Sequence, residues 1–155
     1  MEEYTQEMCI KDTQKHIEQV QLNLYTMIRD LIERALKHDK SKLESPELEI
    51  FTEYTPKLNG TTYGSPEYFE HLKGMQVALD HHYAVNSHHP EHYPNGIQGM
   101  TLLDILEMFC DWKAASMRHA DGDFNHSIEY NQKRFNISEE LTQVFRNTAG
   151  IFDNK

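Results

Sequence analysis

Apolar residues recur at helical spacing through the first part of the chain. Between residues 12 and 36 they lie three or four positions apart, with no glycine or proline among them: Ile17, Val20, Leu24, Met27, Ile28, Leu31 and Ala35. Such spacing places them on one face of a helix, and Asp12 or Thr13 is suited to cap the first turn. The pattern predicts one long amphipathic helix or two nearly collinear ones.

Two serine-proline pairs predict where the next helices start. Ser45-Pro46-Glu47 and Ser65-Pro66-Glu67 each offer a capping hydroxyl, a proline suited to the first turn and an acid that the helix dipole favours. We expect the second of these helices to run from Pro66 to about Ala84. Turn-forming residues predict loops over 54–64 and 88–99.

Helical spacing resumes over 100–117 and continues in two shorter stretches, 123–134 and 138–148. No run of alternating apolar residues predicts a β-strand. The fold class is therefore predicted as all-α, a single-domain helical bundle of about five to seven helices that spans residues 1–155.

Composition narrows the range of partners. Among 155 residues, Lys and Arg total 15 and Asp and Glu total 25, a formal net charge of −10. Broad nucleic-acid binding is not expected, because phosphate backbones are bound by clustered positive charge. No export signal or membrane-spanning stretch is visible, so we expect a cytoplasmic protein without membrane association, and the sequence is compatible with a homo-oligomer. Cys9 and Cys110 lie far apart without metal-binding spacing, which predicts free thiols.

Histidines are concentrated in one segment, and an adjacent His-Asp pair stands at the end of the first predicted helix. The segment holds His81, His82, His88, His89 and His92, and the pair is His38-Asp39. Imidazole is the commonest protein metal ligand, and the pair adds a carboxylate to it. Packing alone explains such a concentration poorly, because each buried imidazole needs partners for both nitrogens. The simpler interpretation of the pair is a surface loop, yet the two segments together predict a metal site on a helical scaffold.

Two aspartates on one predicted helix can add to this site. Asp104 and Asp111 are seven residues apart, two helical turns, and therefore share a face. The alternatives are a favourable N-terminal acid at Asp104 and an ion pair at Asp111. Asp111 is the stronger candidate ligand, because it stands among Phe109, Cys110 and Trp112, where an unpaired carboxylate is costly.

Three segments resemble motifs of the HD superfamily of metal-dependent phosphohydrolases. His38-Asp39-Lys40-Ser41-Lys42 is similar to its HD-x-G-K signature, with serine where glycine is usual. The stretch 88–96 looks like a degenerate HHE-x-x-DG-x-GYP segment without a full GYP triplet, so cyclic-dinucleotide hydrolysis is not implied. The stretch 110–115 resembles AD-x-x-x-A. The chain also looks like a family of small phage and bacterial proteins that share HD-x-SKL, HHPEH and DWKAA.

This resemblance implies an HD-like helical domain with one or two divalent ions, for which Mn, Fe, Co, Ni and Zn are all compatible. It implies His38, Asp39 and Asp111 as core ligands, with His16 as the first ligand and His88 and His89 on a second ion. The histidine segment adds His82 as a candidate ligand. In one unbroken helix His16 and His38 would be roughly 33 Å apart, so the resemblance requires a break between them.

The leading functional interpretation is hydrolysis of a phosphate ester or anhydride in a small molecule, with a nucleotide as the favoured substrate. The expected catalytic residues are Lys42, Asp39 and His88, and the expected substrate contacts are Lys113, Arg118 and Tyr93. One alternative is an HD-type di-iron oxygenase. The other is a non-catalytic, phage-type binding or inhibitory protein whose histidines tie down a loop through a structural metal.

Overall fold

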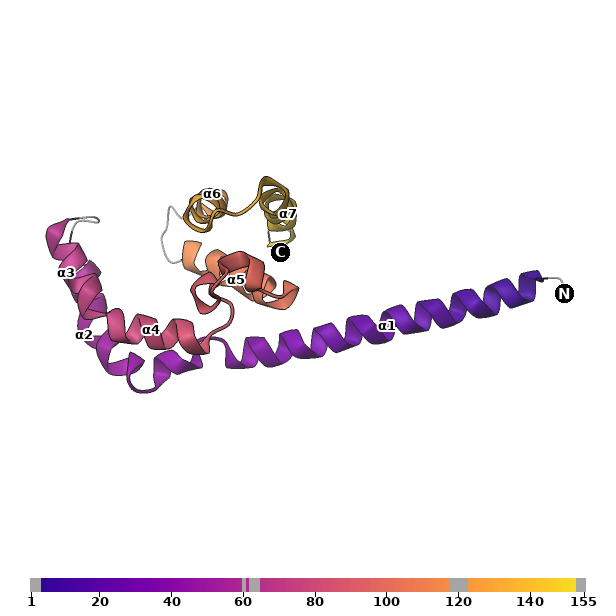
Figure 1. The fold of residues 1–155 in the computed structure, drawn as a ribbon, viewed down its shortest axis with the longest axis horizontal. Coiled ribbons are helices and arrows are strands. Elements are labelled where there is room, and N and C mark those ends of the chain that lie inside the picture. Colours follow the sequence, from indigo (N-terminus) through magenta and orange to yellow (C-terminus); the bar gives the residue numbers. More distant parts are fainter. Residues whose placement is uncertain (1–3, 60, 62–64, 118–122, 153–155) are drawn as a thin grey trace. The chain divides into compact units, whose positions relative to one another are not determined.

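The computed structural model describes residues 4–59, 61, 65–117 and 123–152. Within these ranges every regular element is helical: seven α-helices and four short 3-10 helices, with no strand (Figure 1). The predicted all-α fold class is confirmed. The chain divides into two units, residues 1–37 and 38–155. A single domain over 1–155 stays a prediction.

The first unit contains α1, Gln6–Lys37, which is one unbroken helix of 32 residues. Of the two predicted arrangements, a single helix is the one formed, and it starts nearer the N-terminus than the candidate caps Asp12 and Thr13. Shortly after its end, Asp39 takes a left-handed backbone conformation with φ 55° and ψ 16°. Aspartate tolerates this conformation better than most residues, and the helical backbone does not continue through this position.

The first part of the second unit holds η1 (Lys40–Leu43), α2 (Glu47–Asn59), α3 (Pro66–Gly74) and α4 (Gln76–Val85). Helix α2 packs against α3 and α4. The loop predicted over 54–64 was placed too early, because α2 continues through Pro56 to Asn59. Tyr54 anchors this part of α2 in the fold: its ring lies tightly against Gly74 of α3 and 6.4 Å from the His71 ring. Tertiary packing of this kind can outweigh the helix-breaking tendency of an internal proline.

The helix predicted from Pro66 to about Ala84 is in fact two helices, α3 and α4, which meet at Met75. A Cβ at Gly74 would overlap the Tyr54 ring, so only glycine permits this approach. Met75 is buried directly after the break. The turn between α3 and α4 is therefore set by tertiary packing, which a periodicity argument does not detect.

The remaining elements are η2 (Pro90–His92), η3 (Gly96–Gly99), α5 (Leu102–Ser116), α6 (Phe124–Phe135), α7 (Glu139–Ala149) and η4 (Gly150–Phe152). The three helices predicted in this region are confirmed, and the predicted loop over 88–99 contains only the two short 3-10 turns. Buried apolar residues of α5, α6 and α7 form the core, including Phe109 and Phe145, whose rings stack 5.2 Å apart. This core holds α5, the helix that carries Asp111. Among the described residues, no helix combines the length and apolar character that a membrane crossing requires.

Candidate metal centre

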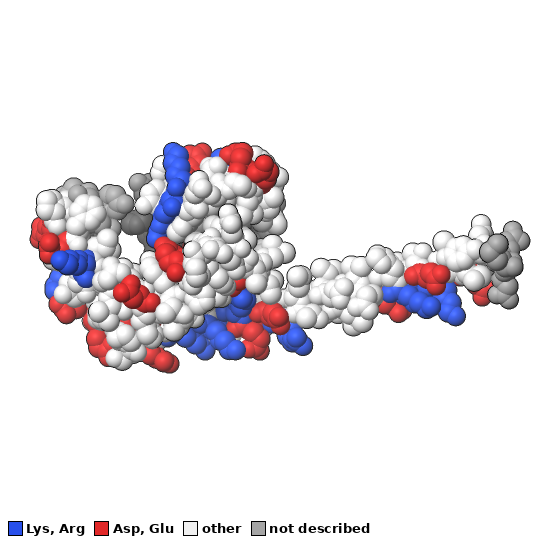
Figure 2. Space-filling view, viewed as in Figure 1, with Lys and Arg blue, Asp and Glu red and all other residues white. Residues whose placement is uncertain are grey.

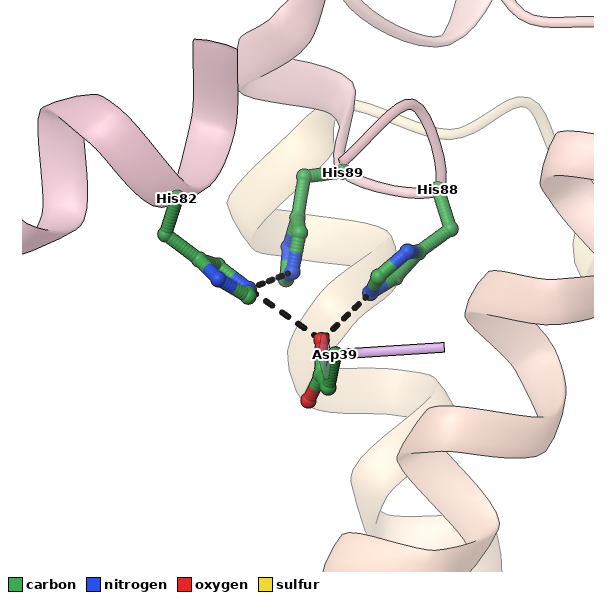
Figure 3. A group of neighbouring side chains, drawn as sticks. All are labelled: Asp39, His82, His88 and His89. Atoms are coloured by element: carbon green, nitrogen blue, oxygen red, sulfur yellow. Dashed lines mark hydrogen bonds and ion pairs between the residues drawn. The ribbon is translucent and has the colours of Figure 1, made fainter. Parts of the chain in front are cut away.

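Three segments of the second unit bring histidine and acidic side chains together. His38 and Asp39 precede η1, His82 lies on the last turns of α4, and the loop after α4 supplies His88 and His89. Helix α5 adds Glu107 and Asp111. Figure 3 shows His82, His88 and His89 directed toward Asp39 from one side. The association of the two histidine-bearing segments predicted from the sequence is therefore present in the fold.

Four residues form a group that we name the imidazole set: Asp39, His82, His88 and His89. The Oδ1 atom of Asp39 lies 3.3 Å from Nε2 of His82 and 3.5 Å from Nε2 of His88. Nε2 of His82 lies 2.9 Å from Nε2 of His89. One ligand atom from each residue falls within 4.8 Å of all the others. Three imidazoles and one carboxylate around a single point form a donor set suited to a transition-metal ion.

A second group, the carboxylate set, contains His38, Asp39 and Asp111. Nε2 of His38 is 3.5 Å from Oδ2 of Asp39 and 3.8 Å from Oδ1 of Asp111. Asp39 thus belongs to both sets, with one carboxylate oxygen facing each. Its carboxylate is placed so that it can bridge two neighbouring cations.

Two glutamates orient the imidazoles from outside. Glu47, which is fully buried, accepts a hydrogen bond from Nδ1 of His82 at 2.8 Å. Oε1 of Glu107 accepts one from Nδ1 of His38 at 2.9 Å and lies 3.2 Å from Nδ1 of His88. Because a carboxylate holds a proton on Nδ1 of His82 and of His88, the opposite nitrogen, Nε2, of these neutral imidazoles can present its lone pair inward. This arrangement is typical of metal-binding histidines.

The interior of the imidazole set holds two polar atoms without a hydrogen-bond partner among the described residues: Oδ1 of Asp39 and Nε2 of His88. They are both buried and face each other at 3.5 Å. Burying unpaired acceptors is costly, and such exceptions call for an explanation. A cation between them would satisfy both atoms, so the residues fit a bound metal ion.

The protonation of the two sets differs. Burial lowers the pKa of His89 to about 3, with the nearby His88 acting in the same direction, and burial also lowers the pKa of His82. In contrast, the carboxylates of Asp111 and Glu107 raise the pKa of His38 to about 10. Near pH 7, His82 and His89 are therefore neutral, the form that binds metal, whereas His38 is protonated and positively charged.

Asp39 and Asp111 remain ionised near neutral pH. Burial raises the pKa of Asp39, but the Lys42 ammonium and the neighbouring His38 together hold the pKa below its usual value. Asp111 behaves in the same way: burial raises its pKa, but the hydrogen bond to His38 together with the neighbouring positive charges, including Lys42, lowers the pKa by more. Lys42 donates to Oδ2 of Asp39 at 2.6 Å. The ammonium thus contacts the oxygen of Asp39 that faces the carboxylate set.

Lys42 also lines a recess of about 380 Å³ beside the imidazole set. His82, His89 and Tyr83 form its polar side, and the other lining residues are Phe51, Thr55, Met75 and Leu79. A second recess of about 250 Å³ shares Tyr83 and His89 with the first and includes Asp111, Asn131 and Arg134. The candidate metal position is thus bordered by spaces that a small molecule can enter.

The residues predicted to contact substrate are placed less favourably. Tyr93 donates its hydroxyl to Oδ2 of Asp104 at 2.9 Å, which anchors the loop. The ammonium of Lys113 lies over the Phe124 ring, 5.2 Å from its centroid. Arg118 lies outside the described residues. Neither Tyr93 nor Lys113 belongs to the imidazole set or the carboxylate set, although the Tyr93 ring lies 4.7 Å from that of His92.

Neither Asp104 nor His16 is a member of the two sets. Asp104 accepts hydrogen bonds from Ser87 and from Thr101, with which it forms a capping box at the start of α5, so the N-terminal role is the one found. His16 lies in α1, about 31 Å of unbroken helix before Lys37. The break that the HD resemblance requires is not present between Gln6 and Lys37.

Glu47 and Glu107 were not identified from the sequence as part of the site. Glu107 had a detectable signal, because it lies three residues after Asp104 and four before Asp111 and so shares their helix face. Glu47 had none beyond its place in the first turn of α2, where an exposed acid is equally favourable. Its burial depends on α2 packing against α4, a tertiary contact.

Comparison with known proteins adds a family but no activity. A family model described as "Family of unknown function (DUF5662)" matches residues 5–152. No curated protein and no solved structure matches the chain.

Proposed function

We propose that this chain, which belongs to DUF5662, a family of unknown function, binds a divalent metal ion in the imidazole set and hydrolyses a small phosphate ester or anhydride. The observation that carries the metal is the facing pair of unpartnered atoms within the described residues, Oδ1 of Asp39 and Nε2 of His88. The resemblance to HD phosphohydrolases in the segments around His38-Asp39, His88-His89 and Asp111 supports the reaction class.

The donor chemistry favours a transition metal. Imidazole nitrogens suit Mn, Fe, Co, Ni or Zn better than Mg or Ca, which prefer oxygen ligands. When bound, such an ion lowers the pKa of a water molecule and polarises a phosphoryl oxygen. Glu47 and Glu107 hold His82 and His88 in the tautomer that this binding needs.

Lys42 is the residue best placed to bind an anionic group. An ammonium has three donors, and the structure uses one of them for Asp39. The same side chain lines the recess of about 380 Å³, so its remaining donors can meet a phosphate oxygen there. This local positive charge offsets the repulsion between an acidic protein and an anionic substrate.

The recess also limits substrate size. Its volume falls near the lower end of the range of roughly 300–1,000 Å³ for small-molecule sites. Phe51 and Tyr83 give it aromatic walls that can pack against a planar group. A mononucleotide is therefore the favoured substrate.

The test begins with metal analysis of purified protein. Chelated protein reloaded with Mn, Fe, Co, Ni or Zn is then assayed for phosphate release from a panel of nucleotides and other phosphate esters. Lys42→Met should keep its metal but lose roughly 10²- to 10³-fold in turnover, as loss of one preorganised charge contact typically does. Lys40→Met is the matched control, since Lys40 is exposed and two residues away. Unchanged turnover in Lys42→Met would remove Lys42 from the mechanism.

The same assays separate the other interpretations. Metal bound without phosphate release, together with oxygen consumption by iron-loaded protein, would indicate an oxygenase. Metal bound with neither activity would indicate a structural metal. Both outcomes would overturn the hydrolase proposal while leaving the metal site intact.

A further inference from the structure

Helix α1 carries a long row of apolar side chains that lack a covering surface within its own unit. None of its residues from Gln6 to Lys37 is buried. Leu24 is 53% exposed, and the side chains of Ile10, Ile17, Val20 and Met27 are exposed as well. A single helix gains little stability from its own hydrogen bonds and usually depends on packing of its apolar face. The row therefore indicates an interaction surface.

The spacing of this row is that of a coiled coil. Ile10, Ile17, Leu24 and Leu31 are seven residues apart, and Thr13, Val20 and Met27 stand three residues after the first three of them. The mean spacing is 3.5 residues, whereas an α-helix has 3.6 residues per turn. A strict seven-residue repeat drifts about 20° per heptad around a straight helix, and it stays in register with a partner helix that supercoils around it. The pattern extends over three heptads.

Charge along α1 permits two identical helices to approach. Residues 19–28 contain no charged side chain, and Figure 2 shows an uncharged stretch of the helix between charged clusters on the visible face. The nearest charges on either side, Glu18 and Arg29, lie on the side of the helix that points away from this apolar row. Two chains of net charge −10 therefore meet without like charges facing each other at the centre of the helix.

We propose that α1 is a self-association element that pairs with α1 of a second copy of this chain through the row from Ile10 to Leu31. The six aliphatic or methionine side chains of this row bury roughly 60–120 Å² each when covered. Two helices thus bury roughly 700–1,400 Å² in these positions alone, and flanking residues such as Ile28 add to it. A specific interface needs about 1,200–2,000 Å² in total, so the row is long enough for a stable dimer.

The decisive experiment compares two leucines on opposite sides of α1. Leu24 belongs to the row, whereas Leu22 points away from it, and the two are similarly exposed, 53% and 59%. The full chain is examined by sedimentation velocity and light scattering at about 10–100 μM. Wild type should have twice the monomer mass of 18.3 kDa. Leu24→Glu should be monomeric, and Leu22→Glu should remain dimeric.

Several results would overturn the proposal. Wild type that is monomeric over this range would show that α1 is covered in another way, for example by its own chain. Dissociation by Leu22→Glu but not by Leu24→Glu would place the contact on the other face, which carries Tyr25, Ile32 and Leu36. Ile17→Gln guards against loss of folding in Leu24→Glu: at the same heptad position it should weaken dimerisation at least about tenfold, and an unchanged dissociation constant would also reject the row.

Discussion

The imidazole set and the carboxylate set share Asp39, yet they meet the electrostatic demands of burial in opposite ways. Around His82 and His89 the imidazoles are neutral, and buried acceptor atoms face one another. Around His38 positive charge is already present, because the pKa of its imidazole is raised to about 10 and Lys42 contacts Asp39. The imidazole set thus presents acceptor atoms to its centre, whereas the carboxylate set is neutralised by a protonated imidazole and an ammonium.

This difference predicts an order of metal binding. An ion entering the imidazole set displaces no proton from neutral His82 or His89 and relieves the unpaired acceptors. An ion entering the carboxylate set competes with the His38 proton and with Lys42. We therefore expect the first ion in the imidazole set and weaker binding in the other. Three experiments test this order of binding.

The largest effect is expected from Asp39→Asn, which removes the charge that both sets share. Asparagine has the same shape and tolerates the left-handed backbone of position 39, so helix content should be retained. Metal affinity should fall by more than the roughly 10- to 100-fold typical of outer-shell substitutions, because a direct ligand is lost. Elemental analysis and circular dichroism measure the two quantities. Full metal occupancy in a folded Asp39→Asn protein would exclude Asp39 from both sets.

A smaller effect is expected from the orienting glutamates, and it should differ between them. Glu107→Gln disturbs His38 and His88, and Glu47→Gln disturbs His82. Each should lower affinity for the first ion by roughly 10- to 100-fold, and only Glu107→Gln should also weaken a second ion. Titration of chelated protein with metal measures both steps. Equal effects of the two variants on the second ion would contradict the separation of the sets.

The smallest effect is a difference in proton release. At pH 8 the first ion should release close to no proton from His82 and His89, because burial keeps both neutral. A second ion should release about one proton, from His38. Calorimetry in buffers of different ionisation enthalpy counts these protons. Release of a full proton with the first ion would reverse the expected order.

The raised pKa of His38 also makes the stability of the metal-free protein depend on pH. Because the folded-state pKa of His38 is about 10 against 6.5 for an unperturbed imidazole, its ionic contacts stabilise the fold fully below pH 6.5. That contribution declines as the pH rises through about 10. His89 acts in the opposite sense: its pKa of about 3 means that stability falls as the pH drops from 6.5 toward 3.

The sequence predicted most helices because their signals are local. The apolar spacing of 12–36 and the serine-proline pairs lie within single elements, and α1, α2 and α3 follow from them. Two boundaries were predicted wrongly, the end of α2 and the single helix from Pro66 to about Ala84, and both lie where tertiary packing adds to the local pattern. The contact of Tyr54 with Gly74 lies between α2 and the junction of α3 and α4, and it joins residues twenty positions apart.

The candidate site was predictable only as far as residue type indicated it. Adjacent His-Asp and His-His pairs identified His38, Asp39, His88 and His89, and an acid in an apolar helix identified Asp111. The division into two sets was not predictable, because it depends on which side chains tertiary packing brings to each carboxylate oxygen of Asp39. Tyr93 shows the converse limit: an aromatic in a loop beside histidines looks like a substrate contact, whereas its hydroxyl is bound to Asp104.

The left-handed backbone at Asp39 has a consequence for how freely this position can vary. Glycine can adopt this conformation but has no metal-binding side chain, and asparagine can adopt it but has no negative charge. Glutamate keeps the charge on a longer side chain, but it tolerates the left-handed conformation less well. Mutational libraries should therefore recover almost only aspartate here when metal binding is selected. In directed evolution toward another metal, His89 and Asp111 are better positions to randomise, because neither has a left-handed backbone that limits the choice of ligand.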